Sequence, residues 1–220
     1  MKIDFRVYLI TDRKLCPGGE IVETVARALD GGVRAVQLRE KDLPGRELFR
    51  LAERMRRLTE GYGARLLIND RADVAMAIGA DGIHLGVLSI PPREARRLLG
   101  AQAAIGCSAH NAEELREAEE GGADFVTFGP VYATPSKDPF GPPVGIPALA
   151  SACRTAGIPV FALGGVGTGN LEEVVRAGSF GIALISGIVA AADPRAAAAA
   201  LTGYFARGLC RAETEREGAS

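Results

Sequence analysis

Cationic and hydroxyl side chains recur in this sequence directly after short apolar segments. The clearest case is Gln37–Lys41, where Arg39 and Lys41 follow an alternating apolar segment. Ser108, Thr134, Ser136 and Lys137 occupy comparable places farther along the chain. Charged nitrogen groups, hydroxyl protons and backbone N–H groups are the donors that bind phosphate oxygens. The pattern therefore indicates a site for a phosphorylated ligand.

Asp70 is the one carboxylate placed directly after such an apolar segment, Arg65–Asn69. Mg²⁺ is commonly bound by one or two carboxylates together with substrate phosphates, so Asp70 is a candidate magnesium ligand. Each residue taken singly also has a local explanation. Arg39 could pair with a neighbouring carboxylate, and Asp70 could cap the next helix. The concentration of these residues after predicted strands favours the ligand site.

The elements that must position these residues are predicted from hydrophobic periodicity. Segments with helical spacing, such as Leu48–Leu58, alternate with short and almost wholly apolar segments of the kind found in parallel sheets. The predicted strands are Phe5–Thr11, Ala35–Arg39, Arg65–Asn69, Gly82–Leu85, Ala104–Ser108, Phe125–Val131, Val160–Gly164 and Gly181–Ser186. This alternation predicts a (β/α)8 TIM barrel as a single domain over residues 1–207, with a doubly wound sheet as the alternative. The polar segment 208–220 is expected to be a frayed tail.

In such barrels the carboxyl ends of the strands meet at one face, where reacting residues lie. The segment Gly129–Gly145 is long for a barrel connection. It carries Thr134, Ser136 and Lys137 among several prolines, and we interpret it as a lid over an anion. Glycines after the last two strands suit a phosphate.

Charge and cysteine usage narrow the partners and the compartment. Lys and Arg total 26 against 27 Asp and Glu, a net charge of −1, which does not favour nucleic acid or an anionic membrane as a partner. No apolar run reaches the ~18 residues of a membrane helix, and Asp4 and Arg6 interrupt any signal-peptide core. The protein is therefore expected to be cytoplasmic. The four cysteines are irregularly spaced, which predicts reduced thiols rather than a zinc site or a disulfide scaffold.

Seven motifs in order resemble the thiamin phosphate synthase and thiazole tautomerase family. They are QLREK, LLIND, GADGIHLG, IGCSAHNAEE, FGPVYATPSK, ALGGV and LISGI, within a similarity that runs from Val7 to Asp193. The resemblance implies a barrel enzyme of thiamin biosynthesis and is compatible with a homodimer. A synthase of this family joins a hydroxymethylpyrimidine diphosphate to a thiazole phosphate and releases diphosphate with Mg²⁺.

The resemblance also implies roles for individual residues. Those expected to hold the pyrimidine diphosphate are Gln37, Leu38, Arg39, Glu40, Lys41, Asn69, Ser108 and Lys137. Those expected to hold the thiazole phosphate are Thr134, Pro135, Ser136, Gly165, Ile185 and Ser186. Lys41 and Lys137 would act in catalysis by stabilising the leaving diphosphate, and Asp70 would bind Mg²⁺. Glu40 is also a candidate tether for its loop.

The segment after the fourth predicted strand departs from the synthase pattern. Ser89 stands where synthases carry a second metal-binding aspartate, and Val87 where they carry glutamine. The tautomerase branch needs no Mg²⁺ and uses a histidine at the place of His110, although His110 could equally orient the start of the next helix. His84 is predicted to be structural.

Three hypotheses follow from these motifs. The synthase is preferred because the diphosphate-binding motifs are intact. The tautomerase is the first alternative, and a non-catalytic thiazole phosphate binder is the second.

Overall fold

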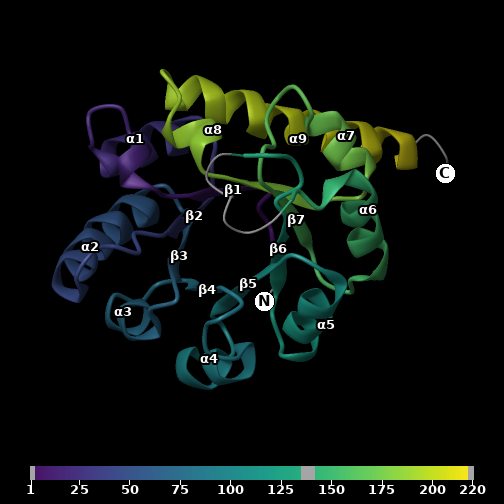
Figure 1. Cartoon of the computed structure of the whole chain (residues 1–220). Helices are drawn as coiled ribbons and strands as arrows, with labels where there is room; N and C mark the ends of the chain where they lie inside the picture. The colour runs from purple at the N-terminus through teal and green to yellow at the C-terminus, as the bar shows by residue number, and fades with distance from the viewer. Residues whose placement is uncertain (1–2, 135–141, 218–220) are drawn as a thin grey trace.

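The computed structural model describes residues 3–134 and 142–217, with residues 208–217 described by their backbone alone. Eight parallel strands close into a barrel in sequence order, and helices surround it (Figure 1). The strands are β1 (Val7–Ile10), β2 (Ala35–Leu38), β3 (Arg65–Asn69), β4 (Gly82–Leu85), β5 (Ala104–Ala109), β6 (Phe125–Phe128), β7 (Val160–Leu163) and β8 (Gly181–Leu184). The predicted TIM barrel is confirmed.

The helices follow the strands as the periodicity predicts. They are the 3-10 helix η1 (Arg13–Leu15) and α1 (Ile21–Asp30), α2 (Gly45–Gly61), α3 (Ala72–Ala77), α4 (Pro92–Leu99), α5 (Ala112–Glu120), α6 (Gly145–Thr155), α7 (Leu171–Arg176), α8 (Ser186–Val189) and α9 (Pro194–Glu217). In the part of the chain that the structure describes, no helix has the length and apolarity needed to cross a membrane.

Several predicted boundaries differ from the structure. β6 ends at Phe128 and β8 at Leu184, before the predicted ends. Pro130 has no backbone N–H to extend the ladder. Ile185 instead precedes α8, which begins at Ser186. Helix α9 runs past residue 208 to Glu217, where the sequence predicted a frayed tail, because Ala, Arg and Glu are good helix formers.

The apolar core has two layers separated by the strands. Alternation along each strand sends one set of side chains toward the helices and the other into the barrel. In β1, Val7 and Leu9 join the outer layer, and Tyr8 and Ile10 join the inner one. The inner layer is built on aromatic rings, with centroids of Phe125 and Phe161 5.3 Å apart. These rings fill the barrel, so it is a packed core rather than a channel.

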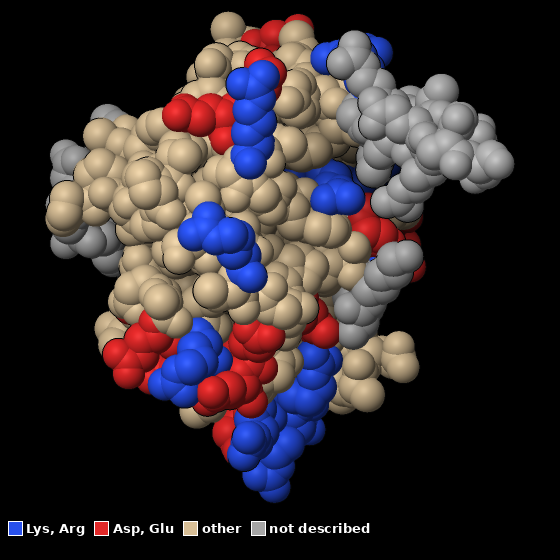
Figure 2. All heavy atoms as spheres, turned by 90° about the vertical axis from the view of Figure 1, so that its right-hand side faces the viewer, with Lys and Arg blue, Asp and Glu red and all other residues tan. Residues whose placement is uncertain are grey.

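Acidic and basic side chains intermingle on the face that Figure 2 presents, most densely on its lower part. Mixed signs of charge keep a surface hydrated without creating a strong field of either sign.

Candidate active site

A cavity of ≈ 480 Å³ lies at the carboxyl ends of the strands. The strand register brings its residues together, because Asn69 pairs with His84 across β3 and β4, and Ser108 pairs with Thr127 across β5 and β6. The residues that the sequence predicted for the site and that line this cavity are Gln37, Arg39, Lys41, Asn69, Asp70, Ser89, Ser108, His110 and Ile185. The tertiary structure thus gathers most of the residues that the sequence assigned to a diphosphate and a metal.

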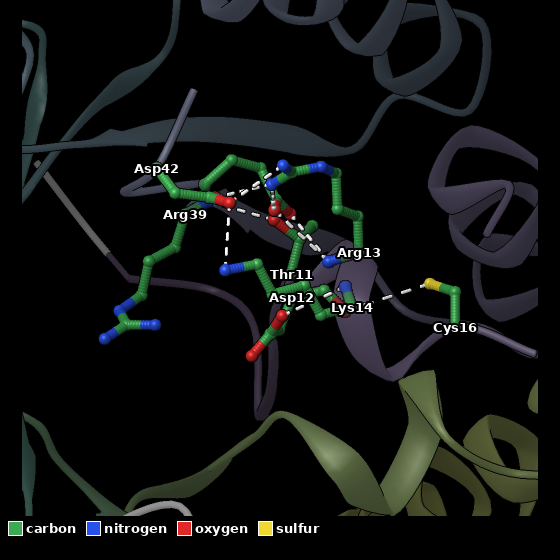
Figure 3. Close-up of polar contacts among 8 residues, drawn as sticks. Thr11, Asp12, Arg13, Lys14, Cys16, Arg39 and Asp42 are labelled. Carbon is green, nitrogen blue, oxygen red and sulfur yellow. Dashed lines mark hydrogen bonds and ion pairs between the residues drawn. The ribbon is translucent and has the colours of Figure 1, made fainter. Parts of the chain in front are cut away.

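The loop after β2 presents its cations and acids to different neighbours. Glu40 is buried and accepts hydrogen bonds from Arg13, through the backbone nitrogen at 3.1 Å and Nη1 at 3.1 Å. Asp42 accepts from Arg13 Nη1 at 2.6 Å and pairs with Lys14 Nζ at 2.9 Å (Figure 3). These bonds to Arg13 and then Lys14 hold the pKa of Asp42 well below its usual range. Glu40 and Asp42 therefore tether the loop to the segment after β1.

The two cations of the same loop, Arg39 and Lys41, line the cavity instead. The side chain of Arg39 points away from Asp42 in Figure 3, and its backbone nitrogen donates to Thr11 Oγ1 at 2.9 Å. Within residues 3–134 and 142–207, Arg39 and Lys41 have no carboxylate partner. The alternative in which Arg39 pairs with Glu40 or Asp42 is therefore wrong. Both cations line the cavity beside Asp12 and Asp70 without forming an ion pair with either carboxylate.

Asp70 adopts a left-handed backbone conformation, with φ of 60°. Its Oδ2 accepts from Asn69 Nδ2 at 2.7 Å, and its Oδ1 accepts from the Ser89 hydroxyl and from Gly86 N at 3.3 Å. Arg71, not Asp70, is the N-cap of α3 and makes no side-chain capping bond. The capping alternative for Asp70 is therefore wrong, and its carboxylate faces the cavity.

Few negatively charged side chains that could bind a metal ion surround Asp70. Among the described residues no group of three or more His, Cys, Asp and Glu side chains could hold a metal ion. Ser89 is neutral, so Asp70 is the only carboxylate of the two positions that synthases use. These residues fit Mg²⁺ only when further oxygens come from a bound phosphate or from water.

His110 lies at the start of α5 and also lines the cavity. Its Nδ1 is 2.8 Å from Glu114 Oε2, and its backbone nitrogen donates to the same oxygen at 2.7 Å. Asn111 caps the helix, with its Oδ1 accepting from Glu114 N at 2.9 Å. Glu114 therefore orients the imidazole and the helix start together, so the structural role of His110 is compatible with a role in the cavity.

A second cavity of ≈ 640 Å³ lies over β7 and β8. The predicted thiazole phosphate residues that line it are Thr134, Gly165, Ile185 and Ser186. Gly165 has φ of +65°, and a Cβ there would come within 2.6 Å of Tyr132 Cβ, so this turn requires glycine. Leu163 and Ile185 line both cavities, so the two cavities adjoin.

Some predicted residues do not line either cavity with their side chains. Leu38 is 1% exposed and packs in the outer layer, because strand alternation turns it away from the side of Gln37 and Arg39. Glu40 is a tether rather than a lining residue. Pro135, Ser136 and Lys137 lie outside the described residues, so the lid hypothesis stays a prediction.

The sequence reasoning missed other residues of the site. Asp12, Leu88 and Thr127 line the first cavity, and Leu88 is 99% exposed. Tyr8 contacts the wall of this cavity from inside the barrel through Gln37. Its inward position follows from the alternation in β1, a signal that was present in the sequence.

The fold and the paired cavities define a class, the (β/α)8-barrel enzymes that act on phosphorylated small molecules. Residues 7–188 match the family model described as thiamine monophosphate synthase. The chain belongs to this family.

Individual relatives agree with the family model. A Geobacter sulfurreducens protein named "Putative thiamine-phosphate synthase" is 56% identical over 200 residues, which cover 91% of this chain and 94% of that protein. The thiamine-phosphate synthase of Moorella thermoacetica is 42% identical, covering 87% and 91% of the two chains. The solved structure of thiamine phosphate pyrophosphorylase from Pyrococcus furiosus superposes with a TM-score of 0.82 at 38% identity, covering 90% and 93%.

Proposed function

We propose that this chain is a thiamin phosphate synthase, which couples a hydroxymethylpyrimidine diphosphate to a thiazole phosphate and releases diphosphate. The observation that carries the proposal is the pair of adjoining cavities. One is lined by the cations Arg39 and Lys41, which form no ion pair with the described residues, and the other by the glycine turn at Gly165 and by Ser186. Two phosphorylated substrates bound in these spaces would meet near Leu163 and Ile185.

The arrangement suits a reaction that needs charge neutralisation and alignment more than a strong base. The bond between the pyrimidine methylene carbon and the diphosphate oxygen breaks, and the diphosphate keeps the electron pair. The thiazole nitrogen then forms the new carbon–nitrogen bond with its lone pair. Arg39 and Lys41 would stabilise the charge that builds on the leaving group. Ser108 would donate a hydrogen bond to it, and by resemblance Lys137 would add a further cation.

We also propose that the reaction uses Mg²⁺. Asp70 would hold the ion together with oxygens of the diphosphate, and Ser89 would contribute at most a neutral oxygen. When bound, Mg²⁺ would supply positive charge to the leaving group.

Two observations favour thiazole tautomerase as the second candidate function. Ser89 replaces the second carboxylate, and Glu114 orients the imidazole of His110 at the edge of the first cavity. An imidazole has one nitrogen that can accept a proton and one that can donate it, so a histidine is suited to moving a proton. The synthase remains the better proposal because a tautomerase has no diphosphate to hold.

One assay separates the two functions. The purified chain is given both synthase substrates, and in parallel the thiazole carboxylate phosphate, each with and without Mg²⁺. The synthase predicts Mg²⁺-dependent release of diphosphate together with thiamin phosphate. Isomerisation of the thiazole without diphosphate release would establish the tautomerase instead.

We further propose that the protein acts in the cytoplasm on small molecules, without nucleic acid or a membrane as partner. Support comes from the free thiols of Cys16, Cys107 and Cys153, since reducing compartments keep thiols free. Burial raises the pKa of the Cys107 thiol to about 12, which makes it unreactive. A homodimer, which rests on the resemblance, is testable by sedimentation.

A further inference from the structure

A hydrogen-bonded path crosses the inside of the barrel beside the first cavity. Gln37 Nε2 donates to the Tyr8 hydroxyl at 3.2 Å, and this hydroxyl lies 3.5 Å from His84 Nδ1. On the other side of the ring, His84 Nε2 lies 3.2 Å from Ser108 Oγ and 3.4 Å from Thr127 Oγ1. All of these residues except Tyr8 also line the cavity. The path therefore joins opposite sides of the cavity wall through the barrel core.

The order of protons along this path follows from the chemistry of its members. Burial raises the pKa of the Tyr8 hydroxyl far above its usual range, against the opposing effect of the hydrogen bond from Gln37. Tyr8 is therefore neutral and has one proton to donate. The amide nitrogen of Gln37 cannot accept it, which leaves His84 Nδ1. A neutral imidazole that accepts at Nδ1 carries its proton on Nε2, so His84 donates to Ser108 or Thr127.

This order of protons makes Gln37, at one end of the path, a hydrogen-bond acceptor and Ser108, at the other end, a hydrogen-bond donor toward the cavity. Gln37 is 1% exposed, and its Oε1 has no hydrogen-bond partner among the described residues. A buried acceptor without a hydrogen bond lowers the stability of the folded state. We therefore infer that a ligand donates a hydrogen bond to Oε1. At the other end His84 Nε2 lies nearer to Ser108 Oγ, at 3.2 Å, than to Thr127 Oγ1, at 3.4 Å. With Ser108 as the acceptor, the proton of its own hydroxyl is available to an oxygen of the ligand.

The surrounding core holds the path in place. His84 is 3% exposed and lies against Phe125 and Tyr8, with ring centroids 5.9 and 5.7 Å apart. Gly106 leaves room for the imidazole, because a Cβ there would lie 2.7 Å from His84 Nδ1. These packing contacts therefore hold the imidazole in place between Tyr8 and Ser108.

We propose that Tyr8 and His84 are positioning residues that set an acceptor at Gln37 for the ring amino group of the pyrimidine and a donor at Ser108 for its diphosphate. The proposal rests on the proposed synthase function for the identity of the ligand. Tyr8 acts only through Gln37 and His84, without touching the substrate. Its effect is on specificity, since the amide held by Tyr8 favours a ring that presents a donor over one that presents an acceptor.

The first test measures the tautomer of His84 by two-dimensional ¹⁵N NMR of the histidine-labelled wild-type chain at neutral pH. The chain has two histidines, so His110→Gln identifies the His84 signals. The expected result is a neutral ring protonated on Nε2. A ring protonated on Nδ1, or a charged ring, would overturn the proposal without any activity being measured.

The second test compares binding of the amino-pyrimidine diphosphate with that of its analogue carrying an oxo group in place of the amino group. In Tyr8→Phe the amide of Gln37 is free to turn over, so the preference for the amino compound should fall by about tenfold, the equivalent of one hydrogen bond. Tyr62→Phe is the matched control, because the Tyr62 hydroxyl donates to Asp30 at 2.8 Å, away from the cavity. An unchanged preference in folded Tyr8→Phe would contradict the proposal.

The two tests separate this inference from the proposed function. A wild-type chain that couples the substrates but carries the Nδ1 tautomer refutes the positioning role alone. A chain that shows the Nε2 tautomer and prefers the amino compound, yet forms no thiamin phosphate, supports the positioning role and refutes the synthase.

Discussion

Ser89 donates its hydroxyl proton to Oδ1 of Asp70, and the same hydroxyl accepts from Gly86 N at 2.8 Å. The loop after β4 is thereby fastened to the end of β3 by a neutral group. In the synthases that the sequence resembles, an aspartate stands at the place of Ser89. In this chain the carboxylate of Asp70 instead accepts hydrogen bonds from Asn69, Gly86 and Ser89. The pair of Asp70 and Ser89 thus has one carboxylate, where a pair of aspartates would have two.

Ser89→Asp should tighten Mg²⁺ binding by about tenfold, because affinity for a hard cation rises with the charge of its ligands. Without metal, two adjacent carboxylates repel each other, so the variant should melt at a lower temperature than the wild type and recover when Mg²⁺ is added. Calorimetric titration and thermal melts measure both effects, with Ser89→Ala as the control. An unchanged Mg²⁺ titration would rule out a metal site at this pair.

Asp70→Asn should lower the coupling rate by about 100- to 1,000-fold, the usual cost of losing one electrostatic stabiliser of a transition state. The amide keeps the size of the side chain, so the fold should persist by circular dichroism. Steady-state kinetics with both substrates provides the measurement. A rate equal to that of the wild type would show that Asp70 does not serve the leaving group.

Arg39→Gln should weaken binding of the pyrimidine diphosphate by at least about tenfold, since hydrogen bonds to charged groups are worth about 1.5–3 kcal/mol. The loop itself should stay in place, because Glu40 and Asp42 tether it through Arg13 rather than through Arg39. Calorimetric titration of the substrate measures the change. The matched control is Arg50→Gln on the exposed surface of α2, which should bind normally; equal losses in the two variants would argue against a role for Arg39 in the cavity.

His110→Ala should leave coupling intact and stop any isomerisation of thiazole carboxylate phosphate, because only the second reaction needs a proton shuttle. Parallel assays of diphosphate release and thiazole aromatisation on one preparation give the result. Isomerisation at the wild-type rate in this variant would eliminate the tautomerase mechanism.

The tether between Asp42 and Arg13 should survive mild acid. Asp42 has a lowered pKa in the folded chain, so its contribution is present above the unfolded value of about 3.9 and is lost only as pH falls through the lower folded value. Carboxyl ¹³C NMR should therefore show a titration midpoint for Asp42 below 3.9, and Arg13→Met should move it upward. A midpoint at or above the unfolded value would mean that the ion pair is not formed in solution.

The sequence by itself determined the architecture and the rim of the site. Alternation and helical spacing are local properties, so Arg65–Asn69 could be placed as a strand and Asp70 as its end without knowledge of the rest of the chain. Because parallel strands present their carboxyl ends to one face, the positions of Arg39, Lys41 and Ser108 at one rim followed as well.

Only the tertiary structure decided which partners these residues take. Arg13 reaches Glu40, Ser89 reaches Asp70, and Tyr8 joins Gln37 to His84 once the barrel has closed. Such contacts depend on strand register and on the layer in which a side chain lies, and neither quantity is written in local spacing. The same closure turned Leu38 away from the cavity and left Arg39 and Lys41 without an ion-pair partner among the described residues.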